Sequence, residues 1–167
     1  MIAEEIFAQA SFARYAFAMT IEVASLGPPW FDAWRGIIFA NAKVLREVER
    51  KLEEHSGISL AFLDVLGRLC DAPGGRLRMQ DLQERSLFTH SGMTRLVDRI
   101  EAVGLVRRES VPGDRRGVSV VVTAEGKRLY EMAFARHQAD LEEAFATRLT
   151  PRQHKAIAEA LSQFWRD

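Results

Sequence analysis

The apolar residues of the chain recur mostly at helical spacing. Such a stripe runs through residues 30–52 and predicts one long amphipathic helix. A second helix is expected from Ser59, a suitable N-cap, to the break at residues 71–75. Residues 2–22 also carry apolar positions at helical spacing, and the Gly-Pro-Pro at 27–29 separates them from the rest.

The middle of the chain has a different pattern. Residues 79–86 predict a short helix, and residues 89–103 predict another with Thr89 as its N-cap. The β-branched runs at 105–110 and 118–122 flank a loop, residues 111–117, that contains two glycines. This arrangement predicts a β-hairpin.

Signals for helix ends complete the pattern. Gly104 is expected to end the preceding helix in a left-handed conformation. A long helix is expected over 123–146, with Glu125 in its first turn. Thr150 followed by Pro151 and Gln153 predicts the start of the last helix. The order of elements predicts a mostly α fold of the α+β class with a small hairpin.

Composition excludes several classes of protein. The 167 residues contain one cysteine, which excludes an intramolecular disulfide framework. The sequence has no run of about 18 apolar residues, so no membrane span is expected. Glu4, Glu5 and Arg14 are unlike a signal peptide, so an intracellular, cytoplasmic protein without a membrane partner is expected.

The sequence contains none of the motifs that are typical of enzymes. There is no Gly-rich phosphate loop, zinc motif or nucleophile elbow. The four histidines are scattered without ligand spacing. We therefore expect no enzyme, no cofactor and no metal site.

The helix at 89–103 has two distinct faces. Successive residues placed 100° apart put one set on an apolar face: Met93, Leu96, Val97 and Ile100. The opposite face carries Ser91, Thr94, Arg95 and Asp98. Short hydroxyls and an arginine near a helix N-terminus suit entry into a DNA major groove, and an ordinary amphipathic surface helix is the alternative.

Charge and the hairpin loop bear on that choice. Although the whole chain has 23 basic and 23 acidic residues, the segment 76–116 holds nine arginines and six acidic residues and is therefore +3. Arg115 and Arg116 lie near the hairpin tip, from which an arginine can reach a minor groove. The alternative is a tight turn in which Asp114 pairs with a neighbouring arginine.

Four segments together resemble the MarR family of winged helix-turn-helix transcriptional regulators. They read Ser91-Gly92-Met93-Thr94-Arg95-Leu96-Val97-Asp98-Arg99-Ile100-Glu101, Gly104-Leu105-Val106-Arg107-Arg108, Gly113-Asp114-Arg115-Arg116-Gly117 and Thr123-Ala124-Glu125-Gly126. The Asp-x-Arg signature of the family's wing falls on Asp114 and Arg116. The resemblance runs from about Trp30 to Trp165.

The resemblance implies a winged helix-turn-helix with a two-stranded wing and long N- and C-terminal dimerisation helices. Residues 30–167 would form the family domain, with dimerisation helices at 30–56 and 123–167 and the DNA-binding lobe at 58–122. Residues 1–29 would be an N-terminal extension whose role stays open. The DNA-binding candidates are His90, Ser91, Thr94, Arg95, Arg115 and Arg116, and Asp114 would be structural in the wing.

The two ends of the chain independently favour a homodimer. They hold more apolar surface than a small winged domain needs: Trp30, Trp34, Ile157, Leu161, Phe164 and Trp165. Packing of these residues within one protomer is the alternative. In a dimer, the two recognition helices would lie about one DNA turn, roughly 34 Å, apart on a pseudo-palindromic operator.

The family also includes sensors of small molecules. Peroxide-sensing members use a reactive cysteine near the domain start, whereas Cys70 lies late in the second helix and is expected to be a buried structural thiol. Urate-responsive members use an aspartate in the second helix, a place that Asp64 could take, and a recognition-helix arginine where this chain has Leu96. His137 and Asp140 form a polar pair near an apolar stripe, as either a satisfied buried pair or a ligand- or pH-responsive site.

The sequence thus predicts a homodimeric, sequence-specific DNA-binding regulator, a repressor relieved by a small-molecule ligand. Its partners would be double-stranded DNA, a second copy of the chain and the effector. The alternative is a dimeric ligand-binding or protein-interaction module that has lost DNA reading.

Overall fold

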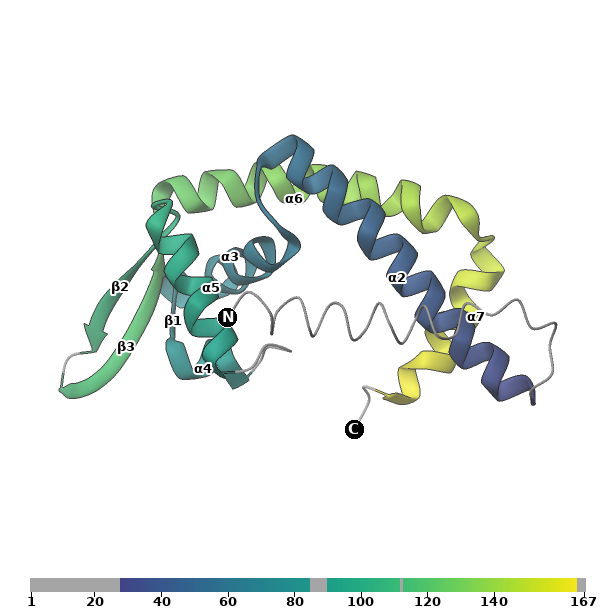
Figure 1. Cartoon of the computed structure of the whole chain (residues 1–167), viewed down its shortest axis with the longest axis horizontal. Helices are drawn as coiled ribbons and strands as arrows, with labels where there is room; N and C mark the ends of the chain where they lie inside the picture. Colours follow the sequence, from purple (N-terminus) through teal and green to yellow (C-terminus); the bar gives the residue numbers. More distant parts are fainter. Residues whose placement is uncertain (1–27, 85–89, 112, 165–167) are drawn as a thin grey trace. The chain divides into compact units, whose positions relative to one another are not determined.

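The computed structural model describes residues 28–84, 90–111 and 113–164, without the side chains of residues 90, 91, 115 and 116. The helix expected over 2–22 lies outside the described residues. The elements, labelled as in Figure 1, are α2 (Pro29–Ser56), α3 (Leu60–Asp71), η1 (Pro73–Gly75), β1 (Arg76–Arg78), α4 (Met79–Glu84), α5 (His90–Ala102), β2 (Val106–Val111), β3 (Asp114–Val122), α6 (Ala124–Ala144), η2 (Ala146–Arg148), α7 (Pro151–Leu161) and η3 (Ser162–Phe164).

The chain divides into two compact units. One unit, called here the winged unit, is Glu49–Asp140, and the other, called the terminal unit, combines Met1–Val48 with Leu141–Asp167. Helices α2 and α6 contribute residues to both units. Within the described residues, no helix combines the length and the apolar character needed to cross a membrane.

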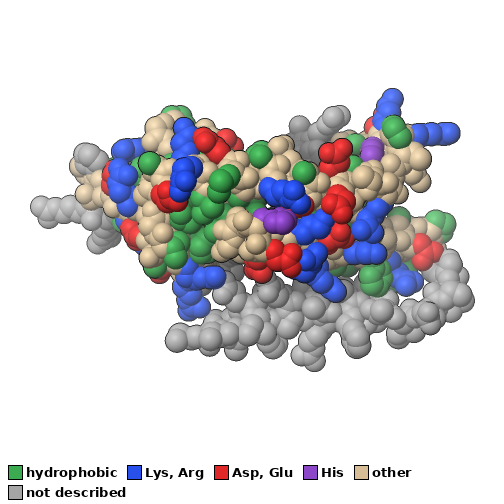
Figure 2. Space-filling view, turned by 90° about the horizontal axis from the view of Figure 1, so that it is seen from above, with side chains coloured by type: hydrophobic (Ala, Val, Ile, Leu, Met, Phe, Trp, Pro, Cys, Tyr) green, Lys and Arg blue, Asp and Glu red, His purple; other side chains and the backbone are tan. Residues whose placement is uncertain are grey.

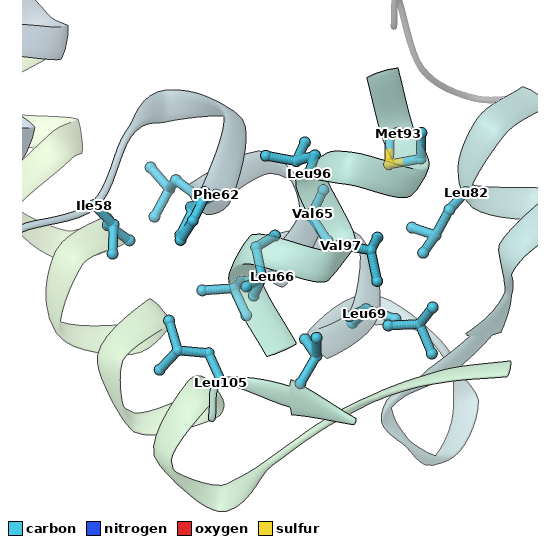
Figure 3. Close-up of a cluster of buried hydrophobic side chains, with 14 of the residues drawn as sticks. Ile58, Phe62, Val65, Leu66, Leu69, Leu82, Met93, Leu96, Val97 and Leu105 are labelled. Carbon is cyan, nitrogen blue, oxygen red and sulfur yellow. The ribbon is translucent and has the colours of Figure 1, made fainter. Parts of the chain in front are cut away.

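The core of the winged unit combines side chains from helices α2 to α6 with side chains from the sheet. The apolar face expected on α5 is confirmed, because Met93, Leu96, Val97 and Ile100 are at most 4% exposed. Figure 3 shows Met93, Leu96 and Val97 of α5 beside Val65, Leu66 and Leu69 of α3, with Leu82 of α4 and Leu105 at the edge of the cluster. Since this packing occupies one side of α5, the opposite side is left outside the core.

The sheet differs from the expected hairpin in two ways. It has three antiparallel strands in the order β1-β3-β2, and β1, with only three residues, was not predicted. The loop expected over 111–117 is wrong in extent, because β3 begins at Asp114 and pairs with β2 from there. Cross-strand hydrogen bonding therefore takes up residues that looked like loop because they are polar and glycine-rich.

Most predicted helix ends are confirmed. Ser59 caps α3 through a hydrogen bond from the Phe62 amide, and Thr150 forms a capping box with Gln153 at the start of α7. Gly104 follows α5 with φ +77°, a conformation that favours glycine. Helix α6 ends at Ala144, two residues before the expected end, and a short 3₁₀ turn follows. The expected cap Thr89 lies outside the described residues.

Candidate nucleic-acid interface

The outward face of α5 presents one free arginine. Arg95 is exposed and Thr94 is half-buried, on the side of the helix opposite the core. No hydrogen bond or ion pair joins Arg95 to another residue of the described part of the chain. His90 begins the helix, and the side chains of His90 and Ser91 lie outside the described set. Arg95 therefore has its full hydrogen-bonding fork available to a partner.

The other described arginines of the segment 76–116 are already engaged. Ion pairs join Arg76 and Arg107 to Glu109, Arg78 to Asp114, and Arg108 to Asp98 and Glu101. The guanidinium of Arg99 stacks over the Phe62 ring, 5.3 Å from its centroid. Over the face of the whole molecule shown in Figure 2, basic side chains are likewise interspersed with acidic ones. The net charge of the segment is therefore a poor measure of the positive charge that it offers to a ligand.

The wing is the hairpin of β2 and β3. Asp114, expected to be structural, lies next to the turn, and its carboxylate accepts a hydrogen bond from Arg78 of β1 at 3.4 Å. This contact joins the base of the turn to β1. Arg115 and Arg116 follow directly in β3, which places their backbone near the tip; their side chains are outside the described set.

The terminal unit exposes large apolar side chains. Of the residues expected at a dimer interface, Trp30 is 68% exposed, Trp34 48% and Phe164 84%. Ile157 is also exposed, Leu161 is half-buried, and Trp165 lies outside the described residues. Further exposed apolar residues of this unit are Phe31, Ile37, Leu45, Leu141 and Phe145. The described part of one chain therefore leaves most of these apolar side chains exposed.

His137 and Asp140 are brought close together on α6. Asp140 is 1% exposed and pairs with Lys51 of α2 at 3.8 Å and with Arg136 at 3.4 Å. Its Oδ2 atom and the Nδ1 atom of His137 are buried without a hydrogen-bond partner in the described part of the chain. Burial lowers the pKa of His137, and the Asp140 carboxylate opposes that shift.

Asp64 and Cys70 lie on α3. Asp64 is exposed and accepts a hydrogen bond from Arg68 at 2.8 Å, and within the described residues no hydrogen bond or ion pair joins it to His137 or Asp140. Cys70 is half-buried rather than fully buried as expected. Burial raises the pKa of its thiol above the ordinary value, and Lys127 only partly opposes the shift, so the thiol form is favoured over the reactive thiolate.

The helix pair α4–α5 packed on α3, followed by the β2–β3 hairpin, defines a winged helix-turn-helix protein. A family model described as MarR family matches residues 56–117. The crystal structure of Sco3205, a MarR family transcriptional regulator from Streptomyces coelicolor, in complex with DNA, is similar to this chain with a TM-score of 0.76 and 30% identity. The match covers 85% of this chain and 89% of that one. The chain belongs to the MarR family of transcriptional regulators.

Two curated relatives from Bacillus subtilis (strain 168) match shorter stretches. The uncharacterized HTH-type transcriptional regulator YfiV is 31% identical over 88 residues, which are 53% of this chain and 54% of YfiV. The HTH-type transcriptional repressor YetL is 30% identical over 100 residues, which are 60% of each protein. The chain thus matches only a little over half the length of each of these two relatives.

Proposed function

We propose that the protein is a homodimeric repressor that binds a pseudo-palindromic operator and is released by a small-molecule effector. Helix α5 enters the major groove, and the β2–β3 wing contacts the adjacent minor groove. The observation that carries the proposal is the division of α5: one side is buried in the core, and the other presents Arg95 without a partner among the described residues.

The comparisons support DNA binding and repression. Sco3205, the structural relative, is described in complex with DNA, and YetL is described as a repressor. By analogy with the family, we assign Thr94 and Arg95 to the major groove, with Ser91 beside them and His90 on a phosphate. Arg116, with Arg115 near it, is assigned to the minor groove or its phosphates. Such a regulator would act in the cytoplasm, where its operator DNA is.

The apolar surface of the terminal unit supports the homodimer. Trp30, Trp34 and Phe164 are each at least 48% exposed in the single chain. Burial of apolar surface contributes about 25 cal/mol per Å², and aromatic side chains are enriched in interfaces. A second copy of the same surface is the partner that family membership supports.

The site proposed for the effector is built around His137 and Asp140. Each has a buried polar atom that lacks a hydrogen-bond partner in the described residues, and a polar ligand would supply one. Asp64 could join such a site only by leaving its ion pair with Arg68. If His137→Ala leaves both the effector response and the pH dependence of operator binding unchanged, this part of the proposal fails.

The test of DNA binding is the selection of genomic fragments by the purified protein, followed by Kd measurements at several salt concentrations. Arg95→Ala should relax base preference at one operator position by about 1–3 kcal/mol. Arg116→Ala should weaken all DNA binding and lower the salt slope by about one unit. Arg128→Ala on α6, which removes an exposed arginine paired with Glu125, is the matched control and should change neither quantity.

The alternative function makes the opposite prediction. A dimeric ligand-binding or interaction module would select no fragment at low salt, and neither arginine substitution would matter.

A further inference from the structure

Two adjacent arginines of β2 lie on opposite faces of the sheet. Arg108 pairs in register with Val120, whose side chain is fully buried in the core of the winged unit. Arg107 therefore projects to the other face, where it pairs with Glu109 two residues on. Because side chains alternate between the two faces of a strand, only Arg108 projects toward α5.

The Arg108 guanidinium binds three groups along one stripe of α5. It forms ion pairs with the Glu101 carboxylate and with Asp98 Oδ1, the latter at 2.7 Å, and donates a hydrogen bond to the backbone oxygen of Thr94 at 3.4 Å. The backbone amide of Arg108 also donates to Glu101 Oε1 at 2.7 Å. These partners are four and three residues apart, so they follow one side of the helix over two turns.

We propose that Arg108 is a positioning residue that fixes the orientation of α5 on the wing and thereby sets how sharply the protein discriminates between operator sequences. The inference rests on the proposed function. Arg95, the residue assigned to base reading, directly follows Thr94, whose carbonyl oxygen Arg108 contacts. Because a bidentate contact between arginine and guanine requires a defined approach, a helix free to shift would bind operator and mismatched sites more equally.

Arg108 is not itself a DNA-contacting residue in this proposal. Its side chain is 25% exposed, and its charge is already balanced by two carboxylates. A planar guanidinium can serve the three acceptors at once, whereas the single ammonium of lysine cannot keep the same geometry. Loss of Arg108 should therefore change sequence discrimination without changing the number of phosphate contacts.

The experiment compares Arg108→Ala with Arg107→Ala, which removes the same charge from the neighbouring position. For the full-length protein, two quantities are measured. The first is the ratio of the Kd for a site with a single-base mismatch to the Kd for the selected operator, and the second is the salt slope. Arg108→Ala should lower the ratio by about fivefold or more, the lower end of one bidentate base contact, and leave the slope unchanged. Arg107→Ala should leave the ratio unchanged.

Two further variants separate positioning from loss of fold. Glu101→Gln weakens the same contact without removing a basic residue, and should lower the ratio in the same direction. Its effect should not add to that of Arg108→Ala in the double variant, because both changes break one interaction. Arg108→Lys keeps the charge and should restore the ratio only in part.

Hydrogen exchange makes failure of this inference distinguishable from failure of the proposed function. Amides of α5 should exchange faster in Arg108→Ala than in Arg107→Ala, whether or not DNA binds. A wild-type protein that selects no DNA overturns the proposed function, and the inference about discrimination with it. An unchanged Kd ratio in Arg108→Ala, or equal losses in the two arginine variants with a lower salt slope, overturns this inference while DNA binding stands.

Discussion

The junction between β3 and α6 offers the sharpest test of the fold. Gly126 lies in the first turn of α6, and a Cβ atom at this position would overlap the backbone oxygen of Leu105. That oxygen already accepts a hydrogen bond from the Thr123 amide at 3.0 Å, and the Thr123 hydroxyl lies 3.1 Å from it. The change Gly126→Ala therefore has two opposing effects: it raises helix propensity, and it forces the new Cβ atom against the Leu105 backbone.

The two effects have opposite signs and different sizes. Replacing glycine by alanine inside a helix favours folding by about 0.8–1.0 kcal/mol. Overpacking costs about 1–3 kcal/mol, and moving the Leu105 carbonyl away would weaken two hydrogen bonds worth about 1 kcal/mol each. The net expectation is that Gly126→Ala destabilises the protein by about 2–4 kcal/mol, which lowers Tm by roughly 5–15 °C for a chain of this size.

The measurement is urea denaturation of wild type and variant at the same protomer concentration, since the stability of the proposed dimer would depend on concentration. Ala124→Gly, at an exposed position of the same first turn, is the matched control and reports propensity with no contact to relieve. It should lose no more than about 1 kcal/mol. A Gly126→Ala variant as stable as wild type, or more stable, would refute the close approach of α6 to Leu105.

Three further predictions concern stability. Burial raises the pKa of Glu49, whose carboxylate accepts from the Leu60 amide, so stability should fall as pH rises above the ordinary value of 4.5. Glu49→Gln keeps an acceptor and should be more stable than wild type at about pH 7 but not at about pH 4 in urea denaturation; equal gains at both would contradict this reasoning. Because burial lowers the pKa of His137, wild type should lose stability as pH falls below 6.5. His137→Gln should lose less stability between about pH 8 and pH 5 in thermal melts. Parallel curves of Tm against pH for the two proteins would count against this reasoning. Leu66→Ala, at a fully buried position, should cost about 2–5 kcal/mol by denaturant titration, and a loss below 1 kcal/mol would mean the site is not core.

Features set by neighbouring residues could be predicted from the sequence. The caps Ser59 and Thr150 act on amides three residues away, so their signal is local. The apolar face of α5 is equally local, because helical periodicity places it. Strand β1 has no such signal: its three residues are a strand only because Leu77 and its neighbours pair with β3, more than 40 residues later. The length of β3 was missed for the same reason.

Candidate site residues divide in the same way. Arg95 could be assigned to the outer side of α5 from periodicity alone. The role of Arg108 could not, because Arg107 and Arg108 are identical in type and only strand pairing decides which of them meets α5. One of the two partners of Asp140 was likewise hidden, since Lys51 lies 89 residues earlier in the chain and on another helix. The ion pairs within the segment 76–116 were hidden in the same way, because Arg78 and Arg108 meet their acidic partners only through the pairing of strands and the packing of α5.

That internal neutralisation bears on how a regulator of this kind would search a genome. Affinity for random DNA grows with each cation free to displace a counterion, and of the six arginines described within residues 76–116 only Arg95 lacks a partner. The four arginines that pair with carboxylates should therefore add less to the affinity for unrelated sequence than their number suggests. Preference for the target would then depend on base contacts more than on these four arginines.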